Sequence, residues 1–126
     1  MSETVLKENS FLVSQTNSKG IITFANEEFC EVAGYTLEEL VNQPHNMVRH
    51  KDMPKSAFED LWNTVKAGNV WQGYVKNATK LGGFYWVFAT VYPYKDESGN
   101  DCYISCRRKP LTAEVKKAEE LYRTMR

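Results

Sequence analysis

The stretch Phe84-Tyr-Trp-Val-Phe-Ala-Thr-Val-Tyr-Pro-Tyr94 decides the fold, because its aromatic and β-branched residues favour one long strand. Glycine-containing turns flank it, Lys80-Leu-Gly-Gly83 before it and Asp96-Glu-Ser-Gly-Asn100 after it. Residues 70–79 and 101–108 beyond these turns also have strand character. Three consecutive strands joined by tight turns predict an antiparallel meander.

The first half of the chain adds two strands and three helices in front of this meander. A turn separates two short apolar runs, which predicts a hairpin. Asn26 and Thr36 are typical helix caps. We expect strands at 11–16 and 21–24 and helices at 26–34, 36–41 and 55–67, with a further helix at 111–126. This order predicts an α+β fold with a five-stranded antiparallel sheet, helices on one side and a C-terminal exit helix.

The length of 126 residues suits one domain with one core. We place that domain at 11–110, between an N-terminal arm or linker at 1–10 and a C-terminal linker or signalling helix at 111–126. The apolar stripe of this last helix has little to pack against at the chain end. We therefore expect it to continue as a coiled-coil or linker helix in a longer parent protein.

The composition excludes several classes of protein. Sixteen basic and sixteen acidic residues balance, which argues against nucleic acid or an anionic membrane as the main partner. The three cysteines have no metal-like spacing and, with no apolar membrane span or signal peptide, indicate a cytoplasmic domain with reduced thiols. Three Trp, seven Tyr and six Phe are many for this length. Such rings serve as core, as an interface or as walls around a flat ligand.

The segment Pro44-His-Asn-Met-Val-Arg-His-Lys-Asp-Met-Pro54 contains both histidines of the chain. Its prolines forbid a long helix, since each removes a backbone donor and restricts the residue before it. Arg49, His50 and Asp52 place a guanidinium, an imidazole and a carboxylate close together. We interpret the segment as one side of the mouth of a cup formed by the rest of the chain.

Three shorter motifs resemble those of a PAS domain, over about residues 9–112. They are Gly20-Ile-Ile-Thr-Phe-Ala-Asn26, Ala33-Gly-Tyr-Thr-Leu-Glu-Glu-Leu40 and Gly83-Phe-Tyr-Trp-Val-Phe-Ala-Thr-Val-Tyr-Pro93. The segment from Gln43 to Pro54, with Trp62, Trp71 and Val75-Lys-Asn77, is similar to the sensor module of bacterial aerotaxis (energy-taxis) receptors. That family usually has proline where Lys51 stands, which should loosen the turn without removing a ligand group.

The resemblance implies a flavin-binding redox or oxygen sensor of a signal-transduction protein in aerotaxis or chemotaxis, with FAD bound non-covalently. FMN and haem remain alternative cofactors, with His45 or His50 as the haem ligand, and a cofactor-free dimerisation module is a third reading. No nucleophile–histidine pair, metal set or nicotinamide fingerprint supports an enzyme. A light-driven cysteinyl adduct is not expected, because the flavin-adjacent turn lacks a cysteine and Cys30 lies in an earlier helix.

The candidate ligand contacts come from chemistry and from the resemblance together. Strand alternation puts Trp71, Val75 and Asn77 on one face, where a ring can stack and an amide can bond a pyrimidine edge. Arg49 can pair with a phosphate or carbonyl, and Asp52 can hold His50 or Arg49. In the competing reading, the two Trp residues are core and the loop is a surface ion-pair cluster. The candidates are Arg49, His50, Asp52, Trp62, Trp71, Asn77, Asn26, Phe58, Val87 and Arg107, the last favouring an anionic reduced flavin.

The strand 84–94 also suggests partners. If Val87 and its alternate neighbours face the cup, then Trp86 and Phe88 face outward as an apolar patch. A downstream signalling helix or the second subunit of a homodimer can dock there, or the chain's own terminal segments can cover it. The resemblance implies a HAMP or chemoreceptor signalling region in the parent, which can be anchored in the inner membrane.

Overall fold

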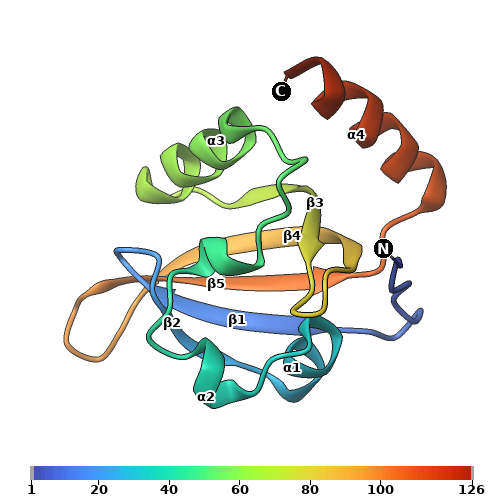
Figure 1. Cartoon of the computed structure of the whole chain (residues 1–126). Coiled ribbons are helices and arrows are strands. Elements are labelled where there is room, and N and C mark those ends of the chain that lie inside the picture. The colour runs from blue at the N-terminus through green and yellow to red at the C-terminus, as the bar shows by residue number, and fades with distance from the viewer. Residues whose placement is uncertain (1, 126) are drawn as a thin grey trace.

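The computed structural model describes residues 2–125; Met1 and Arg126, the outer ends of the expected arm and exit helix, lie outside this range. A five-stranded antiparallel sheet has the strand order β2-β1-β5-β4-β3 (Figure 1). The strands are β1 (Leu12–Asn17), β2 (Ile22–Ala25), β3 (Trp71–Ala78), β4 (Phe84–Lys95) and β5 (Asp101–Arg108). The helices are α1 (Glu27–Ala33), α2 (Leu37–Leu40), the 3-10 helix η1 (His45–Val48), α3 (Lys55–Lys66) and α4 (Thr112–Met125).

The expected α+β fold and all of its elements are confirmed to within two residues at most ends. The caps explain why the short helices form at all. The Asn26 side chain accepts a hydrogen bond from Phe29 N, and Thr36 forms a reciprocal capping box with Glu39. Gly34 ends α1 with φ of 82°, a left-handed conformation that favours glycine.

The inner face of the sheet is hollow at its centre because small side chains meet there. Gly73 pairs with Ala89, and Ser105 lies opposite both Ser14 and Val91. Large buried side chains such as Tyr85 lie outside the lining of this hollow. The expected alternation is confirmed, since Val75, Asn77, Ala89 and Val91 all face this hollow.

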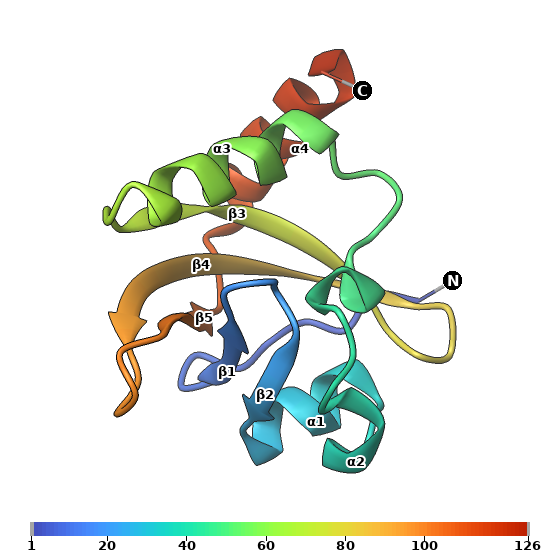
Figure 2. The ribbon, with the colours of Figure 1, turned by 90° about the vertical axis from the view of Figure 1, so that its left-hand side faces the viewer.

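The Pro44–Pro54 segment crosses the hollow from one edge of the sheet to the other (Figure 2). At the β2 edge, Ile22 N donates to Gln43 O and Asn42 N donates to Ile22 O, each at 2.8 Å. At the β3 edge, Arg49 forms a bridge with Asn77, and His50 N donates to Lys76 O at 3.3 Å. The segment therefore closes one side of the cup, as its composition suggested.

The C-terminal helix α4 lies against the outer face of the sheet, and the N-terminal segment pairs with the edge of β4. The ring of Tyr122 on α4 stacks on Trp86 with centroids 6.4 Å apart, and its hydroxyl donates to Tyr74 O at 2.6 Å. Trp86 faces outward, yet it is only 6% exposed because α4 covers it. The N-terminal segment is also better anchored than its polar composition suggested, because Glu3 bridges to Phe84.

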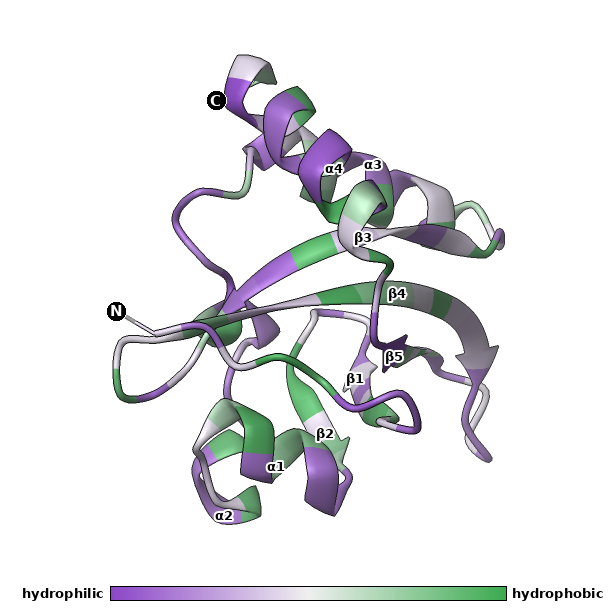
Figure 3. Cartoon of the chain, turned by 90° about the vertical axis from the view of Figure 1, so that its right-hand side faces the viewer, coloured by the Kyte–Doolittle hydropathy of each residue, from purple (hydrophilic) through white to green (hydrophobic). Residues whose placement is uncertain are grey.

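The rest of α4 is mostly hydrophilic (Figure 3), and Leu121 and Met125 of its apolar stripe remain exposed. Among residues 2–125, no helix is long and apolar enough to cross a membrane.

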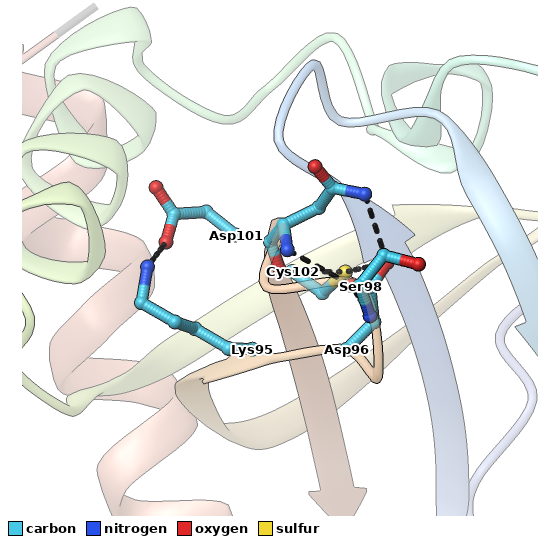
Figure 4. A network of polar contacts seen from close by, with 6 residues as sticks. Lys95, Asp96, Ser98, Asp101 and Cys102 are labelled. Atoms are coloured by element: carbon cyan, nitrogen blue, oxygen red, sulfur yellow. Dashed lines mark hydrogen bonds and ion pairs between the residues drawn. The ribbon is translucent and has the colours of Figure 1, made fainter.

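The turn between β4 and β5 is held by one carboxylate (Figure 4). Asp96 Oδ1 accepts hydrogen bonds from Ser98 N at 3.0 Å and Asn100 N at 2.9 Å. Lys95 and Asp101 form an exposed ion pair at the base of the turn. This local network fixes the register in which β5 returns along β4.

The docking of α4 can be tested at Tyr122. We expect Tyr122→Phe, which removes one hydrogen bond, to cost about 1 kcal/mol. Tyr122→Ala also removes a half-buried ring and should cost about 2 kcal/mol, with faster amide exchange throughout α4. Leu121→Ala, at an exposed position on the same helix, is the control. Unchanged exchange in Tyr122→Ala would show that other contacts hold the helix.

Candidate functional site

A cavity of about 300 Å³ lies between the inner face of the sheet, the Pro44–Pro54 segment and α3. Its floor is the row of small residues described above, and its walls are apolar side chains of α3. Its lining comprises Ser14, Thr16, Ser18, Lys19, Gly20, Pro44, His45, Asn46, Val48, Arg49, Phe58, Leu61, Trp62, Lys66, Val75, Asn77, Ala89, Val91, Tyr103, Ser105 and Arg107.

The lining is strongly cationic. It includes Lys19, Arg49, Lys66 and Arg107, and among the described residues that form it there is no carboxylate. Lys19 and Lys66 are exposed and mark the mouth, whereas Arg107 is buried at the floor with 4% exposure. Because a low-dielectric surrounding strengthens electrostatic attraction, such a cavity favours a ligand with negative charge.

Arg49 has spare hydrogen-bonding capacity. Its guanidinium lies 3.8 Å from the centre of the Phe58 ring, a cation–π contact that fixes its plane. Its Nε is buried without a hydrogen-bond partner in residues 2–125, and burial lowers the pKa of the guanidinium. A buried donor without a partner is costly, so a ligand acceptor at this point would be stabilising.

The groups that hold Arg107 are neutral among the residues that the structure describes. Its Nη2 donates to Ser14 Oγ at 2.9 Å and lies 2.8 Å from His45 Nε2. Burial and the nearby guanidinium of Arg107 lower the pKa of His45 to about 3, so the imidazole is neutral and Nε2 accepts the bond. Burial also lowers the pKa of Arg107, to about 10.

The aromatic wall comes from α3 and β5. Trp62 packs edge-on against Tyr103 with ring centroids 5.4 Å apart. Asn77 is 3% exposed and lines the floor, and its Nδ2 reaches the Tyr85 hydroxyl only at 3.5 Å. A contact of that length is weak. The amide can therefore still bond a polar edge of a ligand.

The structure brings Arg49, Phe58, Trp62, Asn77 and Arg107 together around the cavity and places the other candidates outside its lining. His50 is buried behind the segment, where its Nδ1 accepts from Asp52 N at 3.0 Å. Asp52 forms an ion pair with Lys76 at 2.9 Å on the outer face. The sequence suggested that Asp52 holds His50 or Arg49; its carboxylate instead pairs with Lys76 and lies 3.7 Å from His50 Nδ1.

Trp71 faces inward, but its ring folds back over Gly73 instead of lining the cavity. A Cβ at Gly73 would lie 2.5 Å from that ring, so only glycine admits this packing. The indole Nε1 donates to Asp60 Oδ2 of α3 at 2.9 Å. Trp71 therefore attaches α3 to β3 and supports the wall from behind.

Asn26 and Val87 are also structural in their observed positions. The Asn26 side chain accepts from Val13 N and donates to Phe11 O, in addition to capping α1. Val87 is fully buried and pairs with Val75 across the sheet. Neither side chain lines the cavity.

Sequence reasoning missed the polar floor and the lysines of the mouth. His45, which the sequence offered as a haem ligand, forms a network with Arg107 and Ser14. Alternation along β1 places Ser14 and Thr16 on one face, but only the pairing of β1 with β5 brings Ser14 within hydrogen-bonding distance of Arg107. Among residues 2–125, no group of three His, Cys, Asp or Glu side chains is placed to hold a metal ion.

Comparisons with known proteins agree on the fold. A family model described as the PAS fold matches residues 22–107. The chain is 46% identical over 122 residues to the aerotaxis receptor of Escherichia coli K12. This match covers 97% of this chain and 24% of the receptor. It is 28% identical over 106 residues to the nitrogen fixation regulatory protein of Klebsiella pneumoniae, covering 83% of this chain and 21% of that protein.

Among solved structures, the PAS domain of a protein from Colwellia psychrerythraea matches with a TM-score of 0.71 and 20% identity, covering 79% of this chain and 86% of that one. The chain spans less than a quarter of either relative of known sequence described above.

The low pKa of His45 predicts a pH-dependent stability. The unfolded state binds a proton near pH 6.5 and the folded state near pH 3, so the unfolding free energy should fall as the pH drops through this window. Between pH 7 and pH 5 the contribution is at most about 2 kcal/mol. The unfolding free energy, measured by denaturant titration at several pH values, should fall with decreasing pH by this amount more in the wild type than in His45→Gln. Parallel curves would contradict the buried neutral imidazole.

Proposed function

This chain belongs to the PAS-fold family, and from that premise we propose that its cavity binds a flavin, FAD, non-covalently and that the domain acts as a redox or oxygen sensor in signal transduction. The observation that carries the proposal is the cavity itself, with a cationic lining free of carboxylates and an aromatic wall. The 46% identity to a protein named as an aerotaxis receptor supports the same reading.

The residues present fit a flavin in size and in chemistry. A volume of about 300 Å³ is at the lower end for small-molecule sites and suits a ring system rather than a whole dinucleotide. Trp62 and Phe58 offer flat walls, while Asn77 and Arg49 offer a donor amide and the unpaired Nε for polar edges of the ring. When bound, the flavin supplies reversible electron uptake.

The mouth suits the phosphate groups of the FAD that we propose. Lys19 and Lys66 are the exposed cations of the lining, and phosphate groups that project from the cavity would meet them first. Asn46 and Ser18 add neutral polar groups at the same rim. The ring would occupy the interior and the diphosphate this rim.

Haem and light-driven adduct formation find less support. His45 Nε2 already faces Arg107 and Ser14, and His50 Nδ1 accepts a backbone hydrogen bond outside the lining. Cysteine is not among the described residues that line the cavity. We propose binding rather than turnover, because Ser14 Oγ, although it lies 3.0 Å from His45 Nε2, shares with that nitrogen the buried guanidinium of Arg107.

A route for output runs from the segment to α4. His50 and Asp52 follow Arg49 directly, and Asp52 pairs with Lys76 on the outer face. Lys76 and Asp52 border a small gap that Trp86, Glu119 and Tyr122 complete. We propose that a change in the charge of the ligand shifts this segment and so alters the docking of α4, which would pass the signal to a downstream helix or a second subunit.

Purified protein should carry a flavin that denaturation releases. Absorbance spectra would distinguish flavin bands from a haem Soret band, and the mass of the released compound would distinguish FAD from FMN. A colourless protein that takes up no FAD on reconstitution would refute the proposed function. Illumination should leave no long-lived covalent adduct.

Arg49→Ala should weaken FAD binding on the order of ten- to a hundredfold, because a hydrogen bond to a charged group contributes about 1.5–3 kcal/mol. Arg49→Lys should recover only part of this, since an ammonium lacks the planar fork. Lys51→Ala, an exposed change in the same segment, is the matched control. FAD titrations with apo melting curves would check this. Unchanged affinity in Arg49→Ala, with a lowered apo Tm, would assign the residue to loop support alone.

A further inference from the structure

Helix α3 forms one wall of the cavity and borders empty space along its apolar stripe. Phe58, Leu61 and Trp62 line the cavity and are each only half-buried. The buried residues of the helix are Ala57 and Val65, which have shorter side chains. An apolar side chain beside a cavity makes fewer contacts than one that packs against a filled core. The helix is therefore held less firmly than the sheet that it faces.

One polar contact joins this helix to the sheet. Trp71 Nε1 on β3 donates to Asp60 Oδ2 on α3 at 2.9 Å. Within residues 2–125, the structure shows no second hydrogen bond or ion pair between α3 and a strand. Backbone hydrogen bonds, by contrast, attach the Pro44–Pro54 segment to both edges of the sheet. Of these two walls, α3 is the one that moves at the smaller cost.

The mouth of the cavity lies between α3 and the turn that joins β1 to β2. Trp62 lies against Gly20 there, since a Cβ at Gly20 would be 3.2 Å from the Trp62 ring. The end of α3 next to the mouth leads into an exposed turn at Gly68, whereas its other end follows the fully buried Pro54. A flat ligand ring that passes the mouth must therefore widen the gap between Trp62 and Gly20.

We propose that α3 is a lid over the cavity and that the Trp71–Asp60 hydrogen bond holds it closed, so that Asp60 sets how fast the ligand enters and leaves. The inference rests on the proposed function for the identity of that ligand, FAD. Asp60 is a positioning residue, because it lies outside the lining and acts through the helix. Opening breaks the bond in the free and in the loaded protein alike. Loss of the bond therefore changes both exchange rates and leaves the affinity nearly unchanged.

The two partners of this bond suit a contact that opens and closes. Trp71 is a fixed donor, because it is 8% exposed and its ring packs over Gly73, where a Cβ would be 2.5 Å away. Its strand also pairs with β4 along its whole length. Asp60 is exposed, so water can hydrate its carboxylate once the bond is broken. The closed state gains a charge-assisted hydrogen bond, and the open state leaves no buried charge behind.

The test is stopped-flow binding of FAD to apo protein, with release measured by adding an excess of a flavin-scavenging protein. A hydrogen bond to a charged group that must break for opening corresponds to about tenfold or more in rate. Asp60→Ala and Trp71→Phe, which each remove one partner, should raise both rate constants by this factor and keep Kd within about threefold of wild type. The double variant should be no faster than either single variant.

Two further variants separate the hydrogen bond from a general effect on the helix. Asp60→Asn keeps an acceptor oxygen without the charge and should recover part of the wild-type rates. Glu59→Ala removes an exposed carboxylate at the neighbouring position and should leave both rates as in wild type.

NMR relaxation dispersion on the apo protein reports opening without any ligand. The exchange signal should be confined to residues 55–70, with a larger open population in Asp60→Ala, while β4 and β5 show none. An unchanged association rate in both Asp60→Ala and Trp71→Phe would overturn the inference, and with faster dissociation it would make the bond a support of the loaded state alone. A wild type that binds no FAD would instead refute the proposed function, and the NMR comparison would still test the lid.

Discussion

The hydrogen bonds that attach residues 42–50 to both edges of the sheet hold the cavity open. Backbone groups of Asn42 and Gln43 pair with β2, and those of Arg49 and His50 pair with β3. Edge strands carry unpaired backbone groups that need partners. Here one segment satisfies part of both edges, and because it is anchored at both ends it cannot collapse onto the small residues beneath it.

The same anchoring gives the site its polarity. His45 leaves the β2 end of the segment and Arg49 leaves the β3 end, so one meets the buried Arg107 and the other stacks on Phe58. The two guanidiniums reach the cavity from different elements. Since a cation is costly to bury, the arrangement is more readily explained by a ligand than by stability.

The packing of α4 relates this site to the outer face. Asp52, at the end of the segment, pairs with Lys76, and the gap beside that pair is closed by Tyr122 and Trp86. A displacement of the segment would therefore reach α4 through the Asp52–Lys76 ion pair and the Trp86–Tyr122 ring contact. The short, polar route is the physical basis for the output that we propose.

The sequence by itself determined the elements, because caps, turns and alternation act within a few residues of each other. Asn26, Thr36 and the turn at 96–100 specify their local structure directly. The alternation of β3 and β4 also fixed which residues face inward. Only the tertiary structure decided which of these inward residues line the cavity. Trp71 folds over Gly73 toward Asp60 instead of lining it. Arg107 meets Ser14 and His45, which lie 93 and 62 positions away in the sequence. Such contacts depend on register and on neighbouring volumes, which no local pattern records.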